Sequence, residues 1–158
     1  MNAPSSPAPA APVSFAALRH RGFRAYFLLS ALAMFALVPA VCEEILFRGV
    51  LARSLGRRWS LPAAAAISAV VFALYHVSIV QALPTLTLGF LLGLIAIRAD
   101  SVLPSMIAHA INNALAIAMS RGELPAAAGW IGEHPAAALA VCATSTALGV
   151  AIVLRGPA

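Results

Sequence analysis

Three short groups of polar side chains interrupt an otherwise apolar sequence of 158 residues. They are Glu43-Glu44 with Arg48, His76 four residues after the aromatic Phe72, and His109 with Asn113. Carboxylates, imidazoles and amides can transfer protons, stabilise developing charge or bind metal ions. A charged side chain at the centre of a bilayer costs about 3 kcal/mol even by the lower insertion estimates, so it persists where it is paired or functional. These residues are therefore candidates for a buried functional site.

The spacing of the acidic group indicates how its side chains are arranged. Glu44 and Arg48 are four residues apart, so on a helix they share a face and can form an ion pair. Glu43 is rotated by about 100° from Glu44 and points in another direction. A structural ion pair with Arg48 and a neighbouring helix is the alternative interpretation of both glutamates.

The two histidine groups follow the same helical spacing. His109 and Asn113 share a face, and Phe72 lies one turn before His76, where it can form a wall beside the imidazole. A single histidine or asparagine in an apolar helix is typical of an interhelical hydrogen bond. Their occurrence together with Glu43 favours a functional site.

The composition places these groups in a membrane. Hydrophobic residues make up 62% of the chain and charged residues only 9%, with a mean hydropathy of +0.95, whereas about a quarter of the residues in soluble domains are charged. The apolar runs have the length of helices and lack the alternation of a membrane β-barrel. The net charge of +5 comes from arginines that flank these runs, which suits lipid headgroups and disfavours a nucleic-acid partner.

We therefore predict an all-α, polytopic membrane bundle of about five transmembrane helices. The helices are expected at residues 24–55, 61–80, 81–98, 102–120 and 136–154, with a loop at 121–135. Gly56 is expected to end the first helix, Gly89 and Gly93 suit close helix packing, and Cys42 and Cys142 are interpreted as packing residues. Residues 1–18 are rich in Pro, Ala and Ser and are expected to be disordered, which leaves 19–158 as the membrane-embedded domain.

The predicted helices bring the polar groups to similar depths. At about 1.5 Å per residue from the ends of their helices, Glu43, His76, His109 and Asn113 lie about 10–22 Å into the membrane. Helix tilt changes such values by several ångströms. A single buried site that combines them is feasible.

The motifs Glu-Glu-x-x-x-Arg, Phe-x-x-x-His and His-x-x-x-Asn, each on a separate apolar helix, resemble the CPBP family of intramembrane proteases. That family includes the type II CAAX prenyl endopeptidases and bacteriocin-immunity relatives, and the resemblance covers residues 40–116. It implies that Glu43 and His76 activate a water and that His109 and Asn113 support the oxyanion. The residues expected to support this site are Glu44, Arg48 and Phe72.

A metal-dependent version of the site is an alternative. Glu43, His76 and His109 would form a ligand set for a divalent metal such as zinc. The histidines lie on separate helices, without the compact His-Glu-x-x-His motif of soluble zinc proteases. We therefore favour glutamate-based hydrolysis.

Two other functions compete with an enzyme. A non-catalytic immunity or scaffold protein could use the same cavity to bind a partner, and a small proton-coupled carrier could use the Glu and His residues as a relay. The complete set of polar groups favours the enzyme, and the lack of an inverted repeat disfavours the carrier. We expect a bacterial inner-membrane protein with a peptide or membrane-protein substrate.

Overall fold

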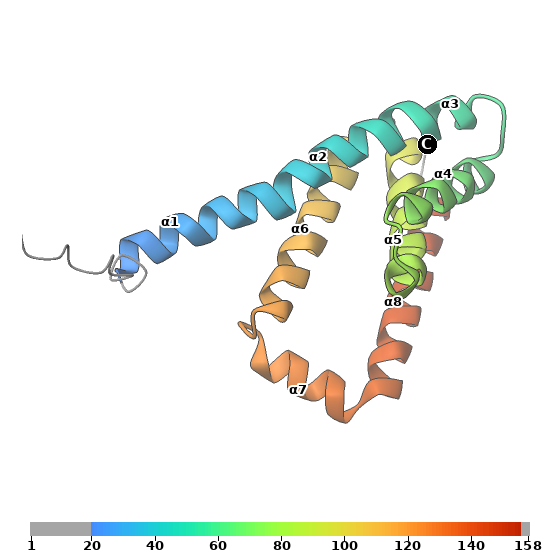
Figure 1. Cartoon of the computed structure of the whole chain (residues 1–158). Coiled ribbons are helices and arrows are strands. Elements are labelled where there is room, and N and C mark those ends of the chain that lie inside the picture. The colour runs from blue at the N-terminus through green and yellow to red at the C-terminus, as the bar shows by residue number, and fades with distance from the viewer. Residues whose placement is uncertain (1–19, 156–158) are drawn as a thin grey trace, which may run out of the picture.

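The computed structural model describes residues 20–155, and every regular element in this part of the chain is a helix (Figure 1). The predicted all-α membrane bundle is confirmed. The tail expected at residues 1–18 lies outside the described residues.

One long helix, Arg21–Gly56, runs across the whole molecule (Figure 1). Its successive segments are α1 (Arg21–Leu32), η2 (Ala33–Leu37), α2 (Val38–Glu44), η3 (Ile45–Ala52) and α3 (Arg53–Gly56). It ends at Gly56, as predicted.

Two segments of this helix, η2 and η3, are π-helical, which the sequence analysis did not predict. Pro39 has no backbone N–H and its ring crowds the preceding turn, and the widened turn η2 ends at Leu37, two residues before it. The segment η3 begins immediately after Glu44 and contains Arg48. A π-helical turn changes the directions of the side chains it carries, and such turns are frequent at functional sites.

Two shorter helices, α4 (Leu61–Tyr75) and α5 (Ile79–Arg98), follow the long one. The prediction that the second helix continues to Val80 was wrong. Val77 has a left-handed backbone, with φ of 48°, which interrupts the helix. The Ser78 hydroxyl then accepts a hydrogen bond from the Gln81 N–H at 3.4 Å and caps α5.

The remaining helices are α6 (Leu103–Ser120), α7 (Pro125–Glu133) and α8 (Pro135–Arg155). The loop predicted at residues 121–135 was wrong, because most of it forms α7, which connects the ends of α6 and α8 (Figure 1). Pro125 lies in the first turn of α7, where its missing N–H is not needed for a helical hydrogen bond. The glycines at 129 and 132 are accommodated inside this helix.

The closest packing in the described chain joins α4 to α5, which lie side by side (Figure 1). A Cβ atom added to Gly89 would lie 3.0 Å from a ring carbon of Phe72, and one added to Gly93 would lie 3.2 Å from the Cα of Ala65. The role predicted for both glycines is confirmed. Their small size lets the backbones of α4 and α5 approach each other and pack closely in the core.

Three helices in the described chain are long and apolar enough to cross a membrane, namely Arg21–Gly56, Ile79–Arg98 and Pro135–Arg155. The helix α4 is apolar but shorter, and α6 carries polar side chains within its length. Cys42 and Cys142 are exposed on these apolar helices, so their interpretation as packing residues was wrong. The apolar outer surface suits lipid as solvent, and the chain is an integral membrane protein.

Candidate active site

A fully buried ion pair lies at the centre of the candidate site. Glu44 Oε1 is 2.9 Å from Arg48 Nη1, and both side chains have no exposed surface. Arg48 Nη2 also donates to the Gly89 carbonyl at 3.2 Å, and its guanidinium lies 4.2 Å from the centre of the Phe72 ring. The ion pair expected from the spacing is therefore present. It also connects the long helix to α4 and α5.

The same glutamate holds the imidazole of His109, which comes from α6. His109 is 3% exposed, and its Nδ1 is 3.0 Å from Glu44 Oε1. A carboxylate that is paired with an arginine can only accept hydrogen bonds, so Nδ1 carries the proton and donates it. The Nε2 atom is then directed to the other side of the ring.

Glu43 lies on that other side. Its Oε2 is 3.7 Å from His109 Nε2, and its side chain is 18% exposed, whereas that of Glu44 is fully buried. The imidazole of His109 thus lies between two adjacent glutamates. Residue spacing indicated that the two carboxylates point in different directions, but it contained no signal that His109, 65 residues away from Glu44, would contact both.

His76 is placed directly after the last residue of α4. Its Nδ1 is 2.9 Å from the Phe72 carbonyl oxygen, which can only accept, so Nδ1 carries a proton and donates it, and this bond leaves Nε2 for another partner. The Phe72 ring contacts both imidazoles, with its centre 4.7 Å from that of His76 and 5.7 Å from that of His109. Phe72 is the wall that the sequence predicted beside His76, and it also separates the two histidines.

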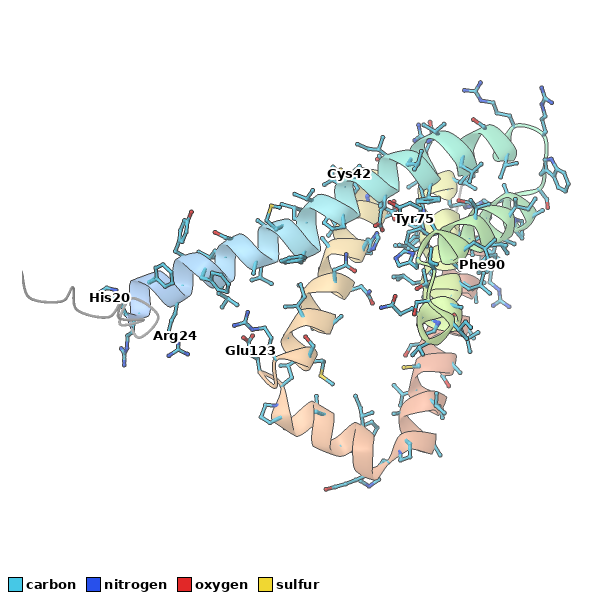
Figure 2. The ribbon with its side chains drawn as sticks, in the orientation of Figure 1. His20, Arg24, Cys42, Tyr75, Phe90 and Glu123 are labelled. Atoms are coloured by element: carbon cyan, nitrogen blue, oxygen red, sulfur yellow. The ribbon has the colours of Figure 1, made fainter. Side chains whose placement is uncertain are left out.

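No hydrogen bond or ion pair between His76 and Glu43 is present among the described residues. The structure therefore brings Glu43 directly to His109, and brings His76 to the same region through Phe72. Tyr75, which Figure 2 labels at the end of α4, contacts the Phe47 ring at 5.5 Å between centres.

Asn113 contacts the long helix one turn along α6 from His109. Its Nδ2 donates to the Ala36 carbonyl in η2 at 3.4 Å, which is a long hydrogen bond. The amide keeps a second N–H and a carbonyl oxygen for other partners. Neighbouring Asn112 is exposed.

Ser68 is a buried polar residue whose role the sequence analysis missed. Its hydroxyl is fully buried and donates to the Phe47 carbonyl at 2.9 Å. A serine in the middle of the apolar helix α4 was the available signal. This hydrogen bond holds α4 against η3, next to Arg48.

The donors do not gather into a metal site in the part of the chain that the structure describes. No group of three His, Cys, Asp or Glu side chains there could hold a metal ion. Of the ligand set considered from the sequence, His109 and Glu43 are adjacent, and His76 reaches the same region through its contact with the Phe72 ring.

Comparison with known proteins identifies a family. A family model described as type II CAAX prenyl endopeptidase Rce1-like matches residues 25–115, a range that includes every candidate site residue. No curated protein and no solved structure matches the chain.

Proposed function

Because the chain belongs to the Rce1-like family of type II CAAX prenyl endopeptidases, we propose that it is an intramembrane endopeptidase that uses Glu43, His76, His109 and Asn113. The family is one of proteases, so its substrates are peptides or proteins. The observation that carries the proposal is the position of the His109 ring between the Glu43 and Glu44 carboxylates.

The first step in this proposal is activation of water by Glu43. Its carboxylate is the more accessible of the two and forms no ion pair with Arg48 among the described residues. Glu43 takes a proton from water while the water oxygen bonds to the scissile carbonyl carbon. The Nε2 lone pair of His76 accepts the second water hydrogen and orients the nucleophile.

The second step is stabilisation of the tetrahedral intermediate. The carbonyl oxygen becomes an oxyanion, which needs donors directed at it. Asn113 offers its remaining N–H. The Nδ1–H of His109 remains hydrogen-bonded to Glu44, so the protonated ring offers its Nε2–H to the oxyanion. The C–N bond then breaks as Glu43 passes its proton to the leaving amine nitrogen.

Glu44, Arg48 and Phe72 position these groups without contacting the substrate. Glu44 fixes the orientation of the His109 ring, as a carboxylate does for the histidine in other hydrolytic sites. Arg48 balances the charge of Glu44 in an apolar core, where a lone carboxylate would be costly. We further propose that the substrate is a peptide or membrane protein and that the chain lies in a bacterial inner membrane.

The test is cleavage of a labelled peptide library by the full chain in liposomes. We expect His76→Ala and His109→Ala to reduce turnover by about 10²–10⁴-fold, the usual contribution of an acid–base group. Circular dichroism and thermal unfolding in detergent check that each variant is folded.

Equal cleavage by both variants and wild type would overturn the assignment. Lack of cleavage by folded wild-type protein across the library would favour a non-catalytic scaffold. In such a scaffold, the buried hydrogen bonds of Arg48 and His109 would serve only to hold the helices together. Chelator treatment of the wild type tests the metal alternative, and the glutamate mechanism predicts unchanged turnover.

A further inference from the structure

A basic pocket lies at the opposite end of the long helix from its Gly56 terminus. It has a volume of about 290 Å³ and lies between the first turns of α1 and the turn that follows α6. Arg24 and Glu123, labelled in Figure 2, come from these two elements. The side chains that line it include Arg21, Phe23, Arg24, Phe27, Arg121 and Glu123.

The pocket has an excess of positive charge. Arg121 Nε is 2.9 Å from Glu123 Oε1, so this arginine has a partner. No ion pair within residues 20–155 involves Arg21 or Arg24. Residues 1–19 contain no Asp or Glu that could supply one. Three guanidinium groups therefore share one carboxylate in this pocket.

The depth of the pocket in the membrane indicates which class of ligand can reach it. Arg21 is the first residue of a helix that is long and apolar enough to cross the bilayer, so the pocket lies at the level of the headgroups. Phe23, Phe27 and Leu28 add an apolar wall to the basic one. A basic wall beside an apolar wall matches a lipid phosphate that continues into acyl chains.

We propose that this pocket binds the phosphate of an anionic phospholipid, with Arg21, Arg24 and Arg121 as its donors. Guanidinium groups form charge-assisted, bidentate hydrogen bonds with phosphate oxygens. The net positive charge selects headgroups that are themselves anionic, since a choline group would place a second cation beside the arginines. A bound lipid would also join α1 to the α6–α7 turn across the open end of the bundle.

The test is native mass spectrometry of the full chain in detergent with added phosphatidylglycerol or phosphatidylcholine. We expect wild type to bind phosphatidylglycerol about tenfold or more tightly than phosphatidylcholine, and Arg24→Gln/Arg121→Gln to lose that preference. The matched control is Arg57→Gln/Arg58→Gln, which removes two exposed arginines at the other end of the long helix and should retain the preference.

Inorganic phosphate separates the two possible sources of the ligand. If the site is for lipid, millimolar phosphate leaves phosphatidylglycerol binding unchanged; complete displacement by phosphate would show a site for the free anion and overturn the lipid assignment. Equal affinity of wild type for the two lipids would also overturn it, and this arm does not depend on how the variants fold.

Discussion

The two adjacent glutamates of the long helix have different surroundings, and this difference is the basis on which the proposed mechanism gives Glu43 a catalytic role and Glu44 a supporting one. Glu44 is fully buried and its Oε1 contacts both Arg48 and His109, whereas Glu43 is 18% exposed and its one ion pair among the described residues is with His109. Residue spacing predicted the Glu44–Arg48 pair and the divergence of Glu43. It could not predict the contact of Glu44 with His109, because that contact depends on how α6 packs against α2.

At the residue scale, Arg48→Met should strongly destabilise the protein. The change leaves Glu44 as a buried charge and removes the hydrogen bond to Gly89, so we expect a loss of about 3–5 kcal/mol in the free energy of unfolding. Unfolding in detergent, followed by circular dichroism, measures it. Arg53→Met is the control, because its partner Asp100 is 95% exposed and such pairs contribute about 0–1 kcal/mol. Equal losses in the two variants would contradict the structural role of Arg48.

At the element scale, the helices were largely predictable and their interruptions were not. Apolar runs and flanking arginines located the long helix, α5, α6 and α8. The end of α4 was missed because the left-handed backbone of Val77 and the Ser78 cap are local features without an apolar signature. The two π-helical segments were missed because a sequence with ordinary helical spacing fits both kinds of turn. The helix α7 was missed because its glycines and Pro125 are also typical of loops.

Also at the element scale, the α4–α5 contact should not tolerate larger residues. We expect Gly93→Val to lower the free energy of unfolding by about 1–3 kcal/mol, because its side chain would press against the Ala65 backbone. Thermal unfolding in detergent checks this. Gly129→Val is the matched control, since a Cβ there meets nothing within 4 Å, and its effect should stay within about 0.5 kcal/mol. An unchanged unfolding midpoint for Gly93→Val would show that the two helices are not packed this closely.

At the scale of the whole molecule, the exposed apolar surface is explained by lipid. Composition alone predicted this, and three long apolar helices agree with it. The long helix, α4 and α6 meet at one site. From the sequence, the similar membrane depths of their polar residues showed only that such a site was feasible, because residue spacing within each helix does not fix which helices are neighbours. Phe72 and Gly89 make that meeting possible, since both contact Arg48.

The membrane placement predicts how the two cysteines react. Cys42 is exposed on the long helix about 20 Å from its Gly56 end, at the helical rise of about 1.5 Å per residue. Lipid should cover both Cys42 and Cys142, so a membrane-impermeant maleimide should label neither in intact liposomes. Arg58→Cys is the positive control, because it lies in the turn outside the helix. Rapid labelling of Cys42 in intact liposomes would place that helix face in water.

The proposed role of Glu43 is tested by the turnover of Glu43→Gln, measured with a cleaved peptide in liposomes, together with the thermal unfolding of the same variant. The substitution keeps the shape of the side chain but removes the base, so we predict a loss of about 10²–10⁴-fold in turnover with an unchanged unfolding midpoint. The matched control, Glu133→Gln on the exposed end of α7, should behave as wild type. Wild-type turnover by Glu43→Gln would contradict the central claim that this carboxylate activates the water.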